Sequence, residues 1–256
     1  MTSHFEPTDS LAGRVAVITG GTGAIGLASA QRLATLGARC VLLYNSEPPE
    51  SAAAKAAALP GSGHLTFKAP VTDSAQLQAV ANQVASACGG VIHILVNSAG
   101  YTQAVPANDL NALTDDLIDD ILKVNFRGVI ATIRAFMPLL KKSEDGLIVN
   151  ISSIAGFTGT GSNLAYVAAK ASIDVVGDAL AKAFAPEVRV ISVSPGVVDS
   201  TFVPGRGTDF NAKVAPTIPL RRIGTADDVA AVVQACATTL RYVTGTRLVV
   251  DGGRHL

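Results

Sequence analysis

The chain has 256 residues, 48% of them hydrophobic, and its 20 Lys and Arg residues balance its 20 Asp and Glu residues. This length suits a single large α/β domain with a sizeable core, and the zero formal charge argues against binding to nucleic acid or to an anionic membrane surface. Residues 1–12 form a polar tail without a signal pattern, and no apolar run is long enough to span a membrane, so we expect a cytoplasmic protein. The three cysteines and four histidines are scattered without metal-ligand spacing, which predicts reduced core thiols and no metal site.

A glycine-rich turn lies near the start of the chain. Residues 14–18 are compact and apolar, which predicts a strand, and residues 27–36 are predicted to form a helix that Gly37 caps. The turn between them has the spacing G-x-G-x-x-G, made by Gly21, Gly23 and Gly26. Such a turn presents backbone N–H groups at a helix N-terminus, where a pyrophosphate can bind. The order of strand, turn and helix therefore predicts a dinucleotide site.

The next predicted strand covers residues 39–44. In dinucleotide-binding folds, the residues at the end of this strand determine the preference for NAD or NADP. An acid there binds the ribose 2′-hydroxyl of NAD, and an arginine accommodates the 2′-phosphate of NADP. This chain has Tyr44, Asn45 and Ser46, which are neither. The absence of an acid favours NADP, and NAD remains the alternative.

Strands and helices alternate through the rest of the chain. Expected helices cover 51–59, 73–88, 113–140, the segment around Tyr166 as far as Phe184, and 225–240; expected strands cover 65–68, 91–96, 146–151, 188–193 and 247–250. This alternation predicts a single-domain Rossmann fold over residues 1–256, with a doubly wound, seven-stranded parallel sheet and helices on both faces. Thr72 or Asp73 is expected to cap the second of these helices.

Two of these helices and one loop carry further predictions. The helices over 113–140 and around Tyr166 are apolar over more than one stripe, which predicts a subunit partner in a homodimer or homotetramer. Residues 200–220 have the composition of a substrate loop. Three arginines in or beside this loop could meet an anionic substrate or be solvated surface residues: Arg206, Arg221 and Arg222.

A hydroxyl, a phenol and an ammonium group occur at spacings that suit proton transfer. Ser153 follows a predicted strand, and Tyr166 and Lys170 are four residues apart on one helical face. A free phenol has a pKa of about 10, and a unit positive charge at ~4 Å can stabilise its anion by roughly 4 kcal/mol at an effective dielectric near 20. The alternative is an ordinary amphipathic helix with one aromatic residue and one snorkelling lysine.

Six motifs in order decide between these readings. They are Thr19-Gly20-x-x-x-Ala24-x-Gly26, Asn97-Ser98-Ala99-Gly100, Asn125, Ser153 thirteen residues before Tyr166, Lys170, and Pro195-Gly196. Together they resemble the short-chain dehydrogenase/reductase family over residues 12–253, nearly the whole chain. The resemblance implies reversible hydride transfer between NAD or NADP and a secondary alcohol or ketone, either a small molecule or a carrier-bound substrate such as a 3-oxoacyl thioester.

The resemblance also assigns residue roles. Tyr166 would be the general acid/base, Lys170 would lower its pKa and bond the nicotinamide ribose, Ser153 would orient the substrate oxygen, and Asn125 would kink its helix and hold a water in a proton relay. The cofactor would be bound by Gly20, Thr22, Gly23, Ala24, Ile25, Gly26, Tyr44, Asn45, Ser46, Val71, Asn97, Ala99, Gly100, Tyr166, Lys170, Pro195, Gly196, Val198 and Ser200.

Three positions depart from the family pattern. Ala24 replaces a glycine, Pro70 replaces an aspartate that contacts adenine, and Ile191 replaces an asparagine. Two other functions remain as alternatives. One is a non-catalytic NAD(P)-binding regulator or scaffold, which the intact Ser153, Tyr166 and Lys170 argue against. The other is sugar-nucleotide epimerase or dehydratase chemistry, which needs a larger substrate domain than the residues after Gly196 provide.

Overall fold

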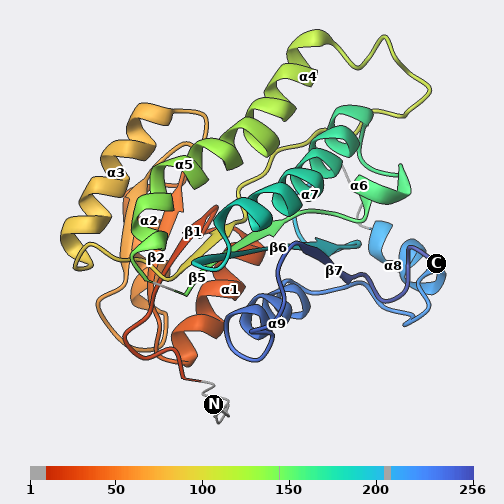
Figure 1. The fold of residues 1–256 in the computed structure, drawn as a ribbon. Coiled ribbons are helices and arrows are strands. Elements are labelled where there is room, and N and C mark those ends of the chain that lie inside the picture. The colour runs from red at the N-terminus through yellow and green to blue at the C-terminus, as the bar shows by residue number, and fades with distance from the viewer. Residues whose placement is uncertain (1–9, 144, 205–208) are drawn as a thin grey trace.

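A seven-stranded parallel sheet forms the centre of the described part of the chain. The computed structural model describes residues 10–143, 145–204 and 209–256, and the strand order is β3-β2-β1-β4-β5-β6-β7 (Figure 1). The strands are β1 (Val15–Thr19), β2 (Arg39–Tyr44), β3 (Leu65–Lys68), β4 (Ile94–Asn97), β5 (Gly146–Ile151), β6 (Val188–Pro195) and β7 (Thr246–Val250). The predicted doubly wound sheet is therefore confirmed.

Helices cover both faces of this sheet because each strand sends alternate side chains to opposite sides. Val15 and Val17 face one core, whereas Ala16 and Ile18 face the other. The first core is covered by α3 (Ser74–Ala87), α5 (Gly128–Lys141) and α7 (Leu164–Phe184), and the second by α1 (Ala24–Thr35), α2 (Pro49–Ala57) and α9 (Ala226–Ala237). A smaller cluster joins α4 (Asp115–Leu122) to the start of α7. Three short helices were not predicted: α6 (Ala155–Thr158), α8 (Phe210–Val214) and the 3₁₀ turn Ala215–Thr217.

The predicted helix over 113–140 is interrupted in its middle. It consists of α4 and α5, joined by a π-helical turn, Lys123–Arg127, that contains the buried Asn125. Directly after this turn, a Cβ on Gly128 would lie 2.8 Å from Cγ2 of Val71, so the helix approaches the loop after β3 closely. The predicted single helix is thus two α-helices with a π-helical turn between them, at the residue that was expected to kink it.

The helix ends follow the sequence signals with small shifts. Asp73 rather than Thr72 caps α3, since its carboxylate accepts a 2.9 Å hydrogen bond from the backbone N–H of Gln76. Thr225 caps α9 in a reciprocal capping box, as expected. Helix α1 begins at Ala24 instead of Leu27, and its C-cap is Leu36. Gly37 follows that cap with a φ of +96°, a conformation that glycine adopts most easily.

Two other predictions concern side-chain burial. Cys40 and Cys236 are buried, Cys88 is half-buried and none of the three forms a disulfide, so they are core thiols; burial raises the pKa of Cys40 to about 12. The apolar side chains of α5 are mostly buried in the chain's own core, so its excess of apolar residues does not require a partner. On α7, Val175 remains 70% exposed. None of the helices in the described ranges is long and apolar enough to cross a membrane.

Candidate active site

A cavity of about 1240 Å³ lies at the carboxyl ends of the strands. This volume exceeds that of a typical small-molecule pocket, so a dinucleotide and a substrate could be accommodated together. Of the site residues expected from the sequence, the cavity is lined by Gly20, Gly23, Ala24, Ile25, Tyr44, Asn45, Ser46, Val71, Ala99, Gly100, Ser153, Tyr166, Lys170, Pro195, Gly196, Val198 and Ser200. The remaining four, Thr22, Gly26, Asn97 and Asn125, are not among the lining residues.

The glycine turn has the backbone geometry of an anion site. Gly20 has a φ of +60°, and a Cβ on it would lie 3.0 Å from Cα of Ala99. A Cβ on Gly26 would lie only 2.3 Å from the carbonyl oxygen of Gly20, so α1 rests directly on the turn. Helix α1 has Gly23 at its N-cap and no side-chain cap, so among the described residues no capping side chain satisfies its first N–H groups. The residues present therefore fit the pyrophosphate of a dinucleotide.

The ends of β1, β4 and β5 are held together behind the cavity. The hydroxyl of Thr19 accepts hydrogen bonds from the backbone N–H groups of Ser98 and Ala99, each at 3.2 Å. Asn97 is paired in register with Asn150, and its Nδ2 donates to Oδ1 of Asn150 at 2.9 Å. Among the described residues, Oδ1 of Asn97 has no hydrogen-bond partner although it is buried. Asn97 thus supports the cavity floor from behind.

An ion pair lies beside the segment that follows β2. The carboxylate of Glu47 is 2.6 Å from Nζ of Lys55 and accepts a hydrogen bond from Ser51, and Lys55 also donates to the carbonyl of Thr22 at 3.0 Å. The hydrogen bond from Lys55, followed by those from Ser51 and Thr22, lowers the pKa of Glu47 to about 2. Glu47 does not line the cavity.

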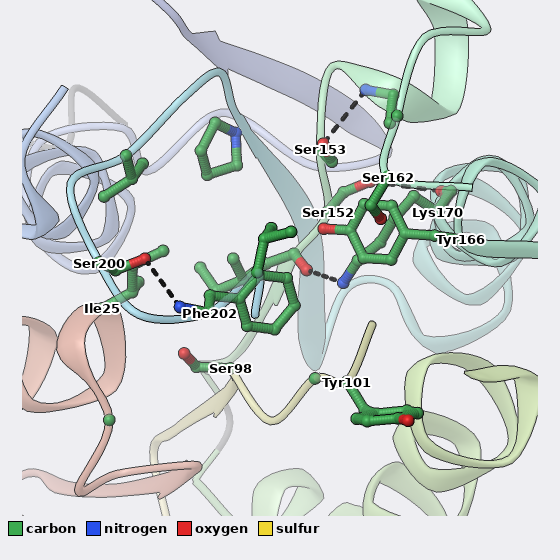
Figure 2. Close-up of a pocket in the computed structure, with 18 of the residues that line it drawn as sticks. Ile25, Ser98, Tyr101, Ser152, Ser153, Ser162, Tyr166, Lys170, Ser200 and Phe202 are labelled. Atoms are coloured by element: carbon green, nitrogen blue, oxygen red, sulfur yellow. Dashed lines mark hydrogen bonds between the residues drawn. The ribbon is translucent and has the colours of Figure 1, made fainter. Parts of the chain in front are cut away.

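Tyr166 and Lys170 project from α7 into the same part of the cavity (Figure 2). Nζ of Lys170 lies 5.5 Å from the centre of the Tyr166 ring and donates a 2.8 Å hydrogen bond to the carbonyl of Ile151. The Lys170 side chain is buried, and burial lowers its pKa to about 8, against an opposing effect of Asp174. An ammonium group at this position is therefore still charged at neutral pH.

The start of α7 is fixed to the loop after β4. Oδ1 of Asn163 accepts a 2.7 Å hydrogen bond from the backbone N–H of Tyr166, and its Nδ2 donates to the carbonyl of Gln103 at 2.7 Å. Ser153 lies next to this region, and its hydroxyl accepts a 3.1 Å hydrogen bond from the backbone N–H of Ala155 at the start of α6 (Figure 2). Ser153, Tyr166 and Lys170 all line the cavity.

Asn125 lies behind the cavity and bonds to the backbone. Its Nδ2 donates to the carbonyl of Ile121 at 2.9 Å and to that of Tyr101 at 2.6 Å, and its Oδ1 accepts from the N–H of Tyr101. These bonds connect the π-helical turn to the loop after β4. A π-helical turn lies where the kink was expected, and the water relay stays a prediction.

Several lining residues were not singled out as site residues, although Phe202, Phe210 and Thr217 lie in the predicted substrate loop, residues 200–220. The Phe202 ring lies 6.0 Å from that of Tyr166, centre to centre, and within 3.2 Å of where a Cβ on Gly100 would be. No spacing in the sequence distinguishes this phenylalanine from other loop residues. Further lining residues outside the expected set include Ser98, Tyr101, Ser162, Phe210, Thr217, Arg254 and His255.

Two of the three arginines considered for an anionic substrate, Arg221 and Arg222, do not line the cavity. Arg222 binds Asp228 through a 2.6 Å ion pair, and Arg221 donates to the carbonyl of Pro216. Both are exposed, as solvated surface residues would be. Arg206 lies outside the described residues.

Comparisons with known proteins give a consistent result over nearly the whole chain. A family model described as enoyl-(acyl carrier protein) reductase matches residues 21–255. The chain is 37% identical over 253 residues to "Granaticin polyketide synthase putative ketoacyl reductase 2" of Streptomyces violaceoruber, a match that covers 97% of this chain and 99% of the relative. It is 31% identical over 246 residues to the 3-oxoacyl-acyl-carrier-protein reductase FabG of Escherichia coli, with 95% and 98% covered. A crystal structure of a short-chain dehydrogenase/reductase from Brucella melitensis superposes with a TM-score of 0.89 at 28% identity, covering 98% of this chain and all of that one.

Proposed function

Since the chain belongs to the short-chain dehydrogenase/reductase family of NAD(P)-dependent oxidoreductases acting on carbonyl and alcohol groups, we propose that Tyr166 is its general acid/base. The reaction is the reversible reduction of a ketone to a secondary alcohol. The observation that carries this proposal is the buried ammonium of Lys170, 5.5 Å from the centre of the Tyr166 ring.

In the direction of reduction, the phenol of Tyr166 gives its proton to the substrate oxygen. A bound nicotinamide supplies the hydride. The phenolate that remains on Tyr166 is stabilised by Lys170, since a unit charge at ~4 Å contributes roughly 4 kcal/mol at an effective dielectric near 20. This is about what a phenol of pKa about 10 needs to exchange protons near neutrality. The hydroxyl of Ser153 orients the substrate oxygen, and Asn125 holds the π-helical turn against the loop after β4.

The cofactor cleft supports NADP as the preferred dinucleotide. Asn45 and Ser46 line the cavity after β2, and neither can oppose a 2′-phosphate by charge. The glycine turn and the first N–H groups of α1 hold the pyrophosphate. Binding of NADP and NAD measured by calorimetry tests this preference, and equal affinities would contradict it.

We also assign the chain's organisation. Residues 1–256 act as one dinucleotide-binding domain in which 200–220 is the substrate loop, and Phe202, Phe210 and Thr217 of this loop line the cavity. The chain assembles as a homodimer or homotetramer, for which the exposed Val175 on α7 is a contact residue. Sedimentation that finds only monomer at micromolar concentration contradicts the assembly.

Substitution of Tyr166 by Phe tests the catalytic proposal directly. Removal of the hydroxyl should lower kcat for ketone reduction by about 10²- to 10⁴-fold, because general acid catalysis contributes on that order. The affinity for NADP should change little, since the ring remains in place. Tyr242→Phe is the matched control, because Tyr242 is fully exposed and lies outside the cavity. Unchanged turnover in Tyr166→Phe would remove Tyr166 from its role and favour a binding protein instead.

A further inference from the structure

Charge is distributed unevenly along the cavity wall. None of the described residues that line it is an Asp or a Glu, whereas Lys170 and Arg254 both line it. The charge of Lys170 serves the proton transfer at Tyr166. Arg254 is therefore a cation of this wall that the proposed reduction leaves without a role.

Most N–H donors of the Arg254 guanidinium form no hydrogen bond with the described residues. Its Nη1 donates to the hydroxyl of Thr217 at 3.2 Å, and within the described ranges no carboxylate forms an ion pair with it. By contrast, Arg222 is held by both oxygens of Asp228, at 2.6 and 2.8 Å. A guanidinium has five N–H donors in a planar fork that fits a carboxylate or a phosphate. Arg254 is half-buried at the cavity wall, so an anion inside the cavity can reach this fork.

The nearby Asp251 does not neutralise Arg254 through a salt bridge. One oxygen of Asp251 accepts from the backbone N–H of Gly253 at 2.9 Å, and the other accepts from the backbone and ring nitrogens of His255 at 2.7 and 2.8 Å. The ring of His255 in turn packs edge-to-face against Phe157 of α6. The carboxylate of Asp251 thus accepts its hydrogen bonds from the turn that follows β7, and these bonds hold the backbone on either side of Arg254 in place.

Arg254 lies far along the sheet from the adenine end of the cleft. It follows β7, whereas Asn45 and Ser46 follow β2, and the strand order places five steps between β2 and β7. At about 4.8 Å for each step, this separation is roughly 24 Å. Ser153 follows β5, only two steps or about 10 Å away. Figure 1 shows the C-terminus beside α8, in the region of the substrate loop. An anion at Arg254 is therefore part of the substrate and not the 2′-phosphate of a cofactor.

We propose that Arg254 binds a carboxylate or phosphate group carried by the ketone whose oxygen receives its proton from Tyr166, an inference that rests on the proposed carbonyl reduction. The substrate class is then an oxo acid or a phosphorylated ketone, and Thr217 orients the guanidinium toward it. Arg254 sets specificity by charge, while the apolar wall of Phe202 and Phe210 accepts the carbon chain.

Three ketones of matched length test this. They are 4-oxopentanoate, its uncharged methyl ester and 3-oxobutylphosphonate, assayed with NADPH in the natural protein, in Arg254→Met and in Arg254→Lys. The natural protein should prefer 4-oxopentanoate to the ester by at least tenfold in kcat/KM. Arg254→Met should lower kcat/KM for both anions by about 10- to 100-fold, because hydrogen bonds to a charged group contribute on that order. It should lower kcat/KM for the ester by less than threefold. Arg254→Lys should retain part of the preference. The anion with the larger kcat/KM identifies the group as carboxylate or phosphonate.

Arg222→Met is the matched control, because this exposed arginine is bound by Asp228 and lies outside the cavity. An anion-to-ester ratio that Arg254→Met leaves unchanged overturns the inference, and reduction of the ester that still requires Tyr166 shows that the proposed function survives. If none of the ketones is reduced, their binding to the enzyme–NADPH complex, followed by NADPH fluorescence, makes the same comparison. Equal binding of anion and ester, or equal binding to the natural protein and Arg254→Met, overturns the inference by this route too.

Discussion

Nη1 of Arg247 on β7 donates a 3.0 Å hydrogen bond to Oδ2 of Asp174, which lies one helical turn after Lys170 on α7. Asp174 is buried, and its second oxygen has no partner among the described residues. The guanidinium of Arg247 also lies 4.4 Å above the centre of the Phe157 ring. The last strand of the sheet thus fixes a negative charge where it raises the pKa of Lys170 against the effect of burial.

Replacing Asp174 by Asn should shift the pH profile of ketone reduction. The pKa of Lys170 is about 8 with Asp174 present, and loss of the carboxylate lowers it further. The ammonium exists only below this pKa, so the alkaline fall in kcat should move to lower pH. The profile reports Tyr166 and Lys170 as a coupled pair. Asp178→Asn, on the exposed face of the same helix, is the control. Coincident profiles for Asp174→Asn and the natural protein would contradict the role.

Gly26→Ala should weaken both the fold and dinucleotide binding. The new Cβ would lie 2.3 Å from the backbone oxygen of Gly20, so α1 must move away from the glycine turn. We expect a loss of about 1–3 kcal/mol in the free energy of unfolding, as for other overpacking substitutions, and at least tenfold weaker NADP binding by calorimetry. Gly177→Ala, whose Cβ would make an ordinary 3.4 Å contact, is the control. Full NADP affinity in Gly26→Ala would show that the turn tolerates the shift.

Asn163→Ala should destabilise the start of α7. The substitution removes the N-cap of α7 and two hydrogen bonds to the loop after β4, from Nδ2 to Thr102 and Gln103. Loss of a buried cap of this kind costs about 1–3 kcal/mol, measurable by urea unfolding. Asn163→Asp keeps an acceptor for the N–H of Tyr166 but has no amide donor. It should therefore restore the contribution of the N-cap to stability and not that of the bonds to Thr102 and Gln103. If Asn163→Ala unfolds at the same urea concentration as the natural protein, the anchor does not contribute to stability.

Asn45→Asp should move cofactor preference toward NAD. The new carboxylate would line the cavity after β2, where it can bond a ribose hydroxyl and repel a 2′-phosphate. The ratio of NADP to NAD affinity should fall at least tenfold, a size typical of a lost or gained charge contact. Asn82→Asp, exposed on α3, controls for the added charge. An unchanged ratio would place the 2′-position away from Asn45.

The sheet could be predicted because its strands are short apolar runs, each followed by a polar or glycine-rich turn. A kink at Asn125 was expected, but its π-helical form could not be predicted, and the helix next to it closely approaches Val71, which lies far from Gly128 in the sequence. The arginine that lines the cavity could not be predicted from sequence position either. Arg221 and Arg222 lie close to the substrate loop in sequence yet bind elsewhere, whereas Arg254 reaches the cavity because the last strand ends beside that loop. Sequence distance does not show which side chains converge.

The hydrogen bond between the side-chain amides of Asn97 and Asn150 favours one register of pairing between β4 and β5. The two residues face each other only when β4 and β5 pair in the observed register. A slip of one residue would turn one amide to the opposite side of the sheet and leave both without their bond in an apolar interior. Pairing of β4 and β5 in a shifted register is therefore less stable than the native pairing, and the two asparagines help to specify the native register of the sheet.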